Sequence, residues 1–144
     1  MPVRLRPVRS EDLPVFFAHQ CDPVAAAMAG FTPRDRVNFD AHWHRILADT
    51  DCIVATIEAD DAPLGYVSTF LQDRRREIAF WIDRAAWNRG IARAAVSAFL
   101  AQHPERPVFA TVLATNAGSR AVLHASGFRA IGPVEPDELL LRLD

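Results

Sequence analysis

The chain has 144 residues, of which 50% are hydrophobic, and a formal net charge of −2 at pH 7. This length predicts one domain, residues 1–144, with its own core, and the charge gives no electrostatic reason to expect a nucleic-acid partner. The chain contains no lysine, which excludes a lysine base or Schiff base. It shows no signal peptide and no apolar run of the ~18 residues that a membrane span needs, so we expect a cytoplasmic protein without a membrane partner.

The cysteines and histidines do not form a metal-binding pattern. Cys21 and Cys52 are far apart in the sequence, and we expect them to be reduced, largely buried thiols. His42 and His44 are separated by a single residue, whereas metal ligands on a helix share a face at a spacing of four. We therefore expect no metal site.

The N-terminal half predicts one strand, two helices and two further strands. Ser10 is placed to cap the first helix, and the pair Asp22-Pro23 is placed to end it. In the second helix Phe39 and Trp43 lie on one face. The predicted strands span 3–6, 52–57 and 65–71, the second helix spans 35–49, and residues 24–34 between the helices are expected to form a loop.

The C-terminal half predicts strands that alternate with helices. Strands are expected at 77–82, 108–113, 128–131 and 139–143, and helices at 91–100 and 119–125. Apolar residues recur in the first of these helices at the spacing of a helix face, as Ile91, Ala95, Phe99 and as Ala92, Val96, Leu100. The order β-α-α-β-β-β-α-β-α-β-β predicts an α/β (α+β) protein with one mixed sheet and helices on both faces.

The most informative stretch runs from the strand at 77–82 through the turn at 88–92 into the following helix. Such a turn leaves the first N–H groups of the helix unpaired, and together with the helix dipole these groups can bind phosphate. Gly90 and Ala92 keep the approach clear, while Arg89 and Arg93 add positive charge. The dinucleotide and nucleotide-triphosphate fingerprints are absent. A tight connection that binds no ligand is the alternative interpretation.

Two motifs resemble those of the GNAT N-acetyltransferases. Arg89-Gly90-Ile91-Ala92-Arg93-Ala94 resembles the family loop R-G-x-G/A-x-A, and residues 116–128 resemble the second signature, N-x-x-S-x-x-V-L-x-x-x-G-F. One helix and one strand separate the two motifs, as in the family. The resemblance implies the GNAT fold along nearly the whole chain, with a single mixed, largely antiparallel twisted sheet and helices on both faces.

The same resemblance implies acetyl-coenzyme A as the co-substrate. The backbone of the loop would hold its pyrophosphate, through Arg89, Gly90, Ile91, Ala92, Arg93 and Ala94. The backbone at Trp81 and Ile82 would pair with the pantetheine arm, and an outward N–H there would polarise the thioester carbonyl. Trp87 departs from the family, because other members often have Gln or Arg at that position.

Catalytic roles are implied in the same way. Glu77 stands where many relatives carry a glutamate that deprotonates the amine, directly or through water; a salt bridge to an arginine of the neighbouring turn is the alternative. Asn116 matches the residue that hydrogen-bonds the cofactor, with Ser119 and Arg120 one turn further on. Many relatives protonate the leaving thiolate with a tyrosine at the position that is Leu123 here. Ser119 is then the candidate acid, as in the ribosomal-protein N-terminal acetyltransferases, which the N-x-x-S pattern resembles.

The expected activity is acetyl transfer from acetyl-coenzyme A to a primary amine, by direct attack in a ternary complex. The acceptor is a small molecule or a protein N-terminus, and the protein is a monomer or homodimer. In GNAT-like proteins the loop between the first two helices closes over the acceptor, so residues 24–34 are expected to set specificity. Two alternatives remain: a non-catalytic acyl-coenzyme A-binding domain of the same fold, and a protein-interaction domain that binds no cofactor.

Overall fold

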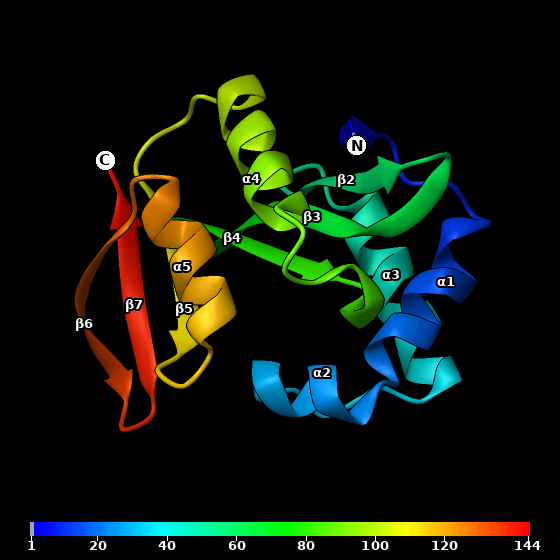
Figure 1. Cartoon of the computed structure of the whole chain (residues 1–144), viewed down its shortest axis with the longest axis horizontal. Coiled ribbons are helices and arrows are strands. Elements are labelled where there is room, and N and C mark those ends of the chain that lie inside the picture. Colours follow the sequence, from blue (N-terminus) through cyan, green and yellow to red (C-terminus); the bar gives the residue numbers. More distant parts are fainter. Residues whose placement is uncertain (1) are drawn as a thin grey trace.

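The computed structural model describes residues 2–144, in which seven strands form one sheet (Figure 1). The strands are β1 (Arg4–Arg6), β2 (Ile53–Ala59), β3 (Ala62–Gln72), β4 (Arg75–Ile82), β5 (Val108–Leu113), β6 (Arg129–Glu135) and β7 (Glu138–Leu143). They lie in the order β1-β2-β3-β4-β5-β7-β6. Neighbouring strands are antiparallel except β4 and β5, which are parallel. The predicted mixed, largely antiparallel sheet is confirmed.

Helices cover both faces of this sheet. The α-helices of the described residues are α1 (Asp12–Gln20), α2 (Pro23–Ala29), α3 (Arg36–Ala48), α4 (Ile91–Gln102) and α5 (Ala117–Ala125). On β3, Val67 packs in the cluster of buried residues that contains Phe99 of α4, whereas its neighbour Tyr66 packs against Phe16 of α1 and Trp43 of α3. Because successive side chains of a strand point to opposite faces, α4 lies on one face and α1 with α3 on the other. None of the helices in residues 2–144 is long and apolar enough to cross a membrane.

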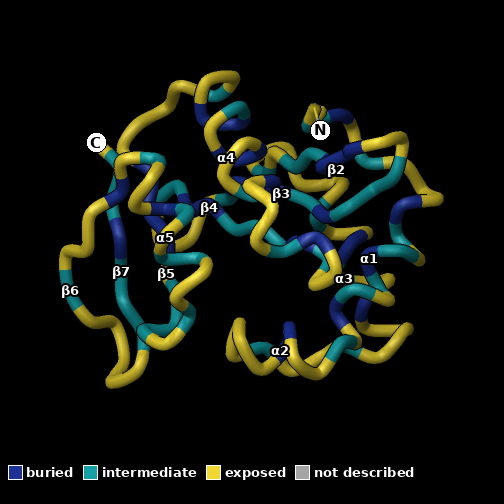
Figure 2. The backbone as a smooth tube through the Cα atoms, viewed as in Figure 1, coloured by how far each residue is buried: buried dark blue, intermediate teal, exposed yellow. Residues whose placement is uncertain are grey.

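The core follows this two-sided arrangement. Dark segments of the tube in Figure 2 mark buried residues within the sheet and on the inner sides of the helices, whereas β6 is exposed along most of its length. The apolar face predicted for α4 is confirmed, since its buried residues are Ile91, Ala95, Val96, Phe99 and Leu100. The larger cluster lies between α4, α5 and the sheet, and the smaller one between α1, α3 and the sheet.

Helix α2 occupies residues for which the sequence predicted a loop. The side chain of Asp22 accepts a hydrogen bond from Val24 N at 3.3 Å, Pro23 stands at the first helical position, and Gly30 ends the helix with φ +66°. Aspartate at the cap, proline at the first position and glycine in the left-handed conformation are typical signals of a helix start and end. The pair Asp22-Pro23 therefore both follows α1 and begins α2, and the prediction recognised only the first role.

Tight hairpins extend the strands beyond their predicted ends. The turn between β2 and β3 contains Asp60 and Asp61 with φ of 52° and 60°, and the turn between β3 and β4 contains Asp73 and Arg74 with φ of 50° and 66°. Two successive left-handed residues give a turn whose twist matches that of the paired strands. Pairing can therefore continue up to the turns, so that β3 begins at Ala62 rather than at the predicted residue 65.

The parallel pair β4 and β5 is joined at one position only. Glu77 lies opposite Phe109, and within the described chain no other residue of β4 pairs with β5. By contrast, β4 pairs with β3 along its whole length, from Arg75 to Ile82. Beyond Glu77 the two parallel strands diverge (Figure 1). Within residues 2–144, one edge of β4 is therefore left without a strand partner in the middle of the sheet.

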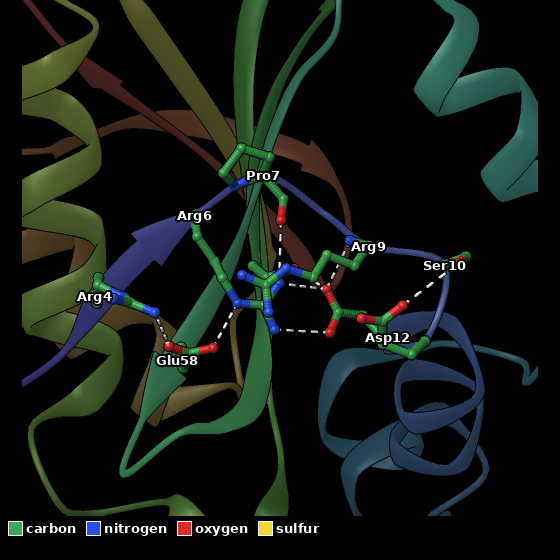
Figure 3. Close-up of polar contacts among 9 residues, drawn as sticks. Arg4, Arg6, Pro7, Arg9, Ser10, Asp12 and Glu58 are labelled. Atoms are coloured by element: carbon green, nitrogen blue, oxygen red, sulfur yellow. Dashed lines mark hydrogen bonds and ion pairs between the residues drawn. The ribbon is translucent and has the colours of Figure 1, made fainter.

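A buried network of charged side chains fastens β1 and α1 to β2 (Figure 3). Arg6 donates to both carboxylate oxygens of Asp12 at 2.8 Å and also to Glu58, which accepts a further hydrogen bond from Arg4. Thr56 Oγ1 donates to Asp12 at 2.9 Å. Burial raises the pKa of Asp12, but the hydrogen bonds from Arg6, a backbone N–H and Thr56 outweigh that effect and lower the pKa to about 2. Asp12 is therefore ionised at neutral pH and holds the start of α1 against the sheet.

Candidate active site

The beginnings of α4 and α5 lie at the same edge of the sheet. β4 leads into α4 through residues 83–90, and β5 leads into α5 through residues 114–116. Because β4 and β5 are parallel, both helices start where the carboxyl ends of these strands diverge. In open, mostly parallel sheets ligands bind outside the carboxyl ends of the strands, and β4 and β5 form one such parallel pair within this mixed sheet. The two motifs of the sequence therefore belong to one candidate site.

The loop before α4 leaves the first amides of that helix uncovered. A short 3-10 turn at Arg84–Ala86 is followed by two residues in the left-handed region, Asn88 with φ +61° and Gly90 with φ +76°. Gly90 directly precedes α4, and no side chain of the described residues caps the helix. A Cβ added to Gly90 would meet no described atom within 4 Å. Uncapped amides beside open space are the arrangement that a pyrophosphate group requires.

The side chains of this loop have different positions. Ile91 is buried in the core, so only its backbone can contact a ligand. The indole Nε1 of Trp87 donates to the carbonyl oxygen of Ile82 at 3.0 Å. The tryptophan that departs from the family pattern therefore ties the loop to the end of β4. Ala92 is half-buried, and the exposed members of the predicted loop are Arg89, Gly90, Arg93 and Ala94.

The register between β3 and β4 determines which peptide groups reach the open edge of β4. Asp83 N donates to Leu64 O at 2.8 Å, and in an antiparallel pair such inward positions alternate along the strand. Trp81 therefore directs its N–H and C=O toward β3, while Phe80 and Ile82 direct their N–H groups toward the side that β5 has left. Pairing of Ile82 with the pantetheine arm stays a prediction, and Phe80 joins it on this edge. Trp81 is left with its side chain as a means of contacting a ligand.

Glu77 lies at the point where β4 and β5 separate. Its buried carboxylate accepts a hydrogen bond from Thr111 Oγ1 at 3.3 Å and lies 3.8 Å from the guanidinium of Arg75. Two residues along β4, on the same face as Glu77, stands Ala79, and two further on stands Trp81. The carboxylate of Glu77 thus lies on the face of the sheet that α1 and α3 cover. The alternative ion pair with a neighbouring arginine is also present, with Arg75.

The second motif caps α5. Asn116 Oδ1 accepts a hydrogen bond from Ser119 N at 3.1 Å, so its amide nitrogen is directed away from the cap and can donate to a ligand. Ser119 is half-buried in the first turn of the helix. Arg120 donates to Ala114 O at 2.8 Å, and its Nε is buried without a hydrogen-bond partner among the described residues. Leu123, at the position of the family's tyrosine, is fully buried in the core.

The two candidate catalytic groups belong to opposite faces of the sheet. Glu77 faces the side of α1 and α3, whereas Ser119 belongs to α5, whose Leu123 packs into the cluster on the other side. Among residues 2–144 no hydrogen bond joins Glu77 to Ser119. Glu77 accepts a hydrogen bond from Thr111, and the backbone N–H of Ser119 donates to Asn116. Both groups can act on one thioester only where β4 and β5 have separated.

The segment after α2 crosses the fork between these strands on the face of Glu77. A Cβ added to Gly30 would lie 2.7 Å from Leu113 Cδ1 of β5, so the end of α2 approaches β5 closely. The next residue, Phe31, contacts Trp81 of β4 with 5.3 Å between ring centroids. In Figure 1, α2 lies beneath the region where β4 and β5 diverge. The sequence predicted that residues 24–34 lie near the acceptor, but it did not predict these contacts. The available signal was the adjacent pair Gly30 and Phe31.

Comparison with known proteins agrees with this geometry. Residues 3–129 match the family described as the acetyltransferase (GNAT) domain. No curated protein matches the sequence. The solved acetyltransferase of Thermus thermophilus has a TM-score of 0.84 at 20% identity, with 99% of this chain and 97% of that chain covered.

Two further solved structures carry informative descriptions. Spermidine N-acetyltransferase from Vibrio cholerae, in complex with CoA and spermine, has a TM-score of 0.84 at 16% identity, with 98% of this chain and 94% of that chain covered. RimJ from Mycobacterium smegmatis, in complex with CoA-disulfide, has a TM-score of 0.79 at 23% identity, with 98% of this chain and 81% of that chain covered. At these identities the likeness shows the fold.

The fold, the forked parallel strands and the uncapped helix start define a domain of the GNAT type. Since the family match spans residues 3–129, the chain belongs to the GNAT acetyltransferase family.

Proposed function

We propose that the protein transfers an acetyl group from acetyl-coenzyme A to a primary amine. The observation that carries this proposal is the open edge of β4 beside the uncapped start of α4. Unpaired strand amides at Phe80 and Ile82 suit the amide-containing pantetheine arm, and the amides after Gly90 suit the pyrophosphate. The open edge of β4 leads to the start of α4, just as the pantetheine arm of coenzyme A leads to its pyrophosphate.

The reaction needs a base for the amine and an oxyanion donor. Glu77 is the proposed base, because its carboxylate faces the side from which an amine reaches the fork. The amine nitrogen bonds to the carbonyl carbon, the bond from that carbon to sulfur breaks, and the ammonium proton passes to the carboxylate or to water. An N–H on the open edge of β4 stabilises the oxyanion. The thiolate leaves with a proton from Ser119 or without a dedicated acid, since a thiol has a pKa near ~8.5.

We propose an acceptor that is a small-molecule amine or a protein N-terminus. Amine acceptors are supported by the solved structures of similar fold, whose descriptions include a spermidine N-acetyltransferase. The ribosomal-protein branch is supported by the N-x-x-S pattern and by the likeness to RimJ at 23% identity.

Thermal unfolding with and without acetyl-coenzyme A tests the cofactor site. At a hundred times the dissociation constant a ligand stabilises the fold by ~2.7 kcal/mol, which raises Tm by several degrees for a chain of this size. Gly90→Glu should abolish the shift, because it places a carboxylate over the amides and a side chain at φ +76°. Gly132→Glu is the matched control, since Gly132 also has positive φ and open space but lies on β6. No shift for the wild type would overturn the proposal.

A non-catalytic acyl-coenzyme A-binding domain is the second candidate. The fully buried Leu123 favours it, because the position that provides an acid in many relatives is here part of the core. Release of free coenzyme A thiol on a panel of amines separates the two candidates. A thermal shift together with thiol release supports the enzyme, and a shift without release on any amine supports the binding domain.

A further inference from the structure

A small cavity lies between the helices α1 and α3 and the strands β3 and β4. Its volume is about 20 Å³, and its aromatic walls include Phe16, Phe31, Trp43, Tyr66 and Trp81. A cavity of this volume holds about one water-sized group. It therefore admits only the end of a ligand, such as one oxygen of a carboxylate. Trp81 lines this cavity and belongs to β4, the strand of the proposed thioester site. The cavity lies on the same face as Glu77, so we assign any ligand group that enters it to the acceptor.

The charge of the cavity comes from one arginine. Arg34 lines it, and within residues 2–144 no carboxylate lies in salt-bridge distance of the Arg34 guanidinium, which lies over the ring of Phe31 at 5.2 Å. The side chain of Gln20 fixes the backbone beneath it, accepting from Arg34 N at 2.8 Å and donating to Arg34 O at 2.9 Å. The lining of the cavity thus includes a positively charged side chain whose backbone is fixed by Gln20. No aspartate or glutamate of the described chain is among its lining residues.

The other polar lining groups are neutral at pH 7. Burial and the positive charges of Arg34 and a second arginine lower the pKa of His42 to about 4. Burial raises the pKa of Tyr66 to about 12. Burial also lowers the pKa of His19, against the opposing effect of Asp83. Asp83, 3.7 Å from His19 Nε2, does not itself line the cavity. Among the described residues, nothing in the lining cancels the arginine.

Two lining residues also carry buried polar atoms that have no hydrogen-bond partner within residues 2–144. They are Trp81 Nε1, which is a donor, and His19 Nδ1. Both atoms are covered by protein on all sides, so they are not among the groups that a ligand in the cavity contacts. An anionic oxygen matches the guanidinium of Arg34.

We propose that this cavity receives one oxygen of the carboxylate of an acceptor amine that is itself acidic, as in an amino acid, and that Arg34 is the residue that selects it. The inference rests on the proposed acetyl transfer. It sets this chain apart from an enzyme that accepts polyamines, since a polycation would bring positive charge to a cavity that already holds the charge of Arg34.

Matched acceptor pairs test this inference. Glycine, L-alanine and 4-aminobutyrate are compared with their amides, which differ in charge but hardly in size, and spermidine serves as the polycation; the readout is release of coenzyme A thiol. At least one acid should exceed its amide in kcat/KM by about tenfold or more, the usual effect of a hydrogen bond to a charged group. Preference for the amides or for spermidine would overturn the inference.

Variants assign the selectivity to Arg34. Arg34→Gln should remove the preference for the acid, while its Tm and its response to acetyl-coenzyme A stay those of the wild type. The control is Arg36→Gln, which removes the same charge two residues away at an exposed arginine paired with Asp40 outside the cavity. An acid-to-amide ratio unchanged by Arg34→Gln would contradict the assignment.

A binding measurement keeps the inference separate from catalysis. Trp43 and Trp81 line the cavity, so saturable quenching of tryptophan emission by butyrate, and not by butyramide, is expected in the wild type and not in Arg34→Gln. If no amine is acetylated, the proposed function fails while this titration still decides the question. Butyrate that leaves the emission unchanged then rules the cavity out as a carboxylate site.

Discussion

The ring of Phe31 lies edge-on to the indole of Trp81, with 5.3 Å between the centroids and an interplanar angle of 67°. This contact joins the segment after α2 to the central strand β4 on the face of Glu77. It therefore forms a wall beside the proposed approach of the acceptor amine.

Phe31→Ala should weaken acceptor binding and leave cofactor binding unchanged. Aromatic pairs contribute about 0.5–1.5 kcal/mol beyond the area they bury, so KM for the acceptor should rise about fivefold while the thermal shift with acetyl-coenzyme A persists. Phe17→Ala is the control, because Phe17 and Phe39 form an aromatic pair of the same 5.3 Å centroid distance, and Phe17 does not line the cavity. Equal effects of the two variants on KM would show that Phe31 acts through stability alone.

Glu77→Gln tests the base. The amide keeps the size of the side chain and can still accept from Thr111, but it cannot take up a proton. We expect kcat/KM to fall about 100-fold and the pH–rate profile to change shape, since turnover then depends on the ionisation of the amine itself.

Two observations would contradict the assignment of Glu77. The first is a pH–rate profile that the substitution leaves unaltered. The second is an equal loss in Glu105→Gln, a control at an exposed glutamate that pairs with Arg76. Cofactor binding, measured by the thermal shift, should be the same in both variants.

Asn116 has a structural and a proposed binding role, and two substitutions separate them. Asn116→Ala removes the cap of α5 and should cost about 1 kcal/mol of stability. Asn116→Asp retains an oxygen for Ser119 N but replaces the donor nitrogen, so stability should recover while affinity for acetyl-coenzyme A stays low. Denaturant unfolding and cofactor titration give the two readouts. Affinity that recovers together with stability would mean that the residue is a cap only.

The buried aspartate of the Arg6 network predicts a loss of stability in acid. Asp12 is 1% exposed, and its pKa is lowered from 3.8 to about 2. A lowered pKa means that the stabilisation is complete above pH 3.8 and is lost as the pH falls through 2. The loss attributable to this group is about 2 kcal/mol, measurable by denaturant unfolding from about pH 5 downward.

Substitution of the same aspartate at neutral pH gives a second measurement. Asp12→Asn leaves the buried Arg6 with Glu58 as its remaining carboxylate partner, so the cost should lie below the ~3–5 kcal/mol of a fully unpaired buried charge, at about 2–3 kcal/mol. Asp40→Asn breaks an exposed pair with Arg36 one helical turn apart and should cost less than ~0.5 kcal/mol. A similar small cost for both substitutions would show that the network contributes little.

The features that could be predicted from the sequence are those that local patterns determine. The strand at 77–82, the turn through Gly90 and the apolar face of α4 are determined by residues near one another, and the structure confirms them. Features that depend on how strands pair, or on which distant residues meet in the fold, could not be predicted in this way. The register with Leu64 turns the backbone of Trp81 inward, and only the fold brings Arg34 to the cavity beside Trp81. Helix α2 was missed for a different reason, since its signals were present but were interpreted as a break.

The two hydrogen bonds between the side chain of Gln20 and the backbone of Arg34 have a consequence for how the sequence of such a protein can change in evolution. They close residues 21–33 into a loop whose two ends are joined by hydrogen bonds of 2.8 and 2.9 Å. Changes of length or sequence within that loop need not disturb the packing of α1 against α3. If the proposed function is right, the segment that faces the acceptor can change in evolution, and with it the preferred acceptor, while the rest of the fold stays the same.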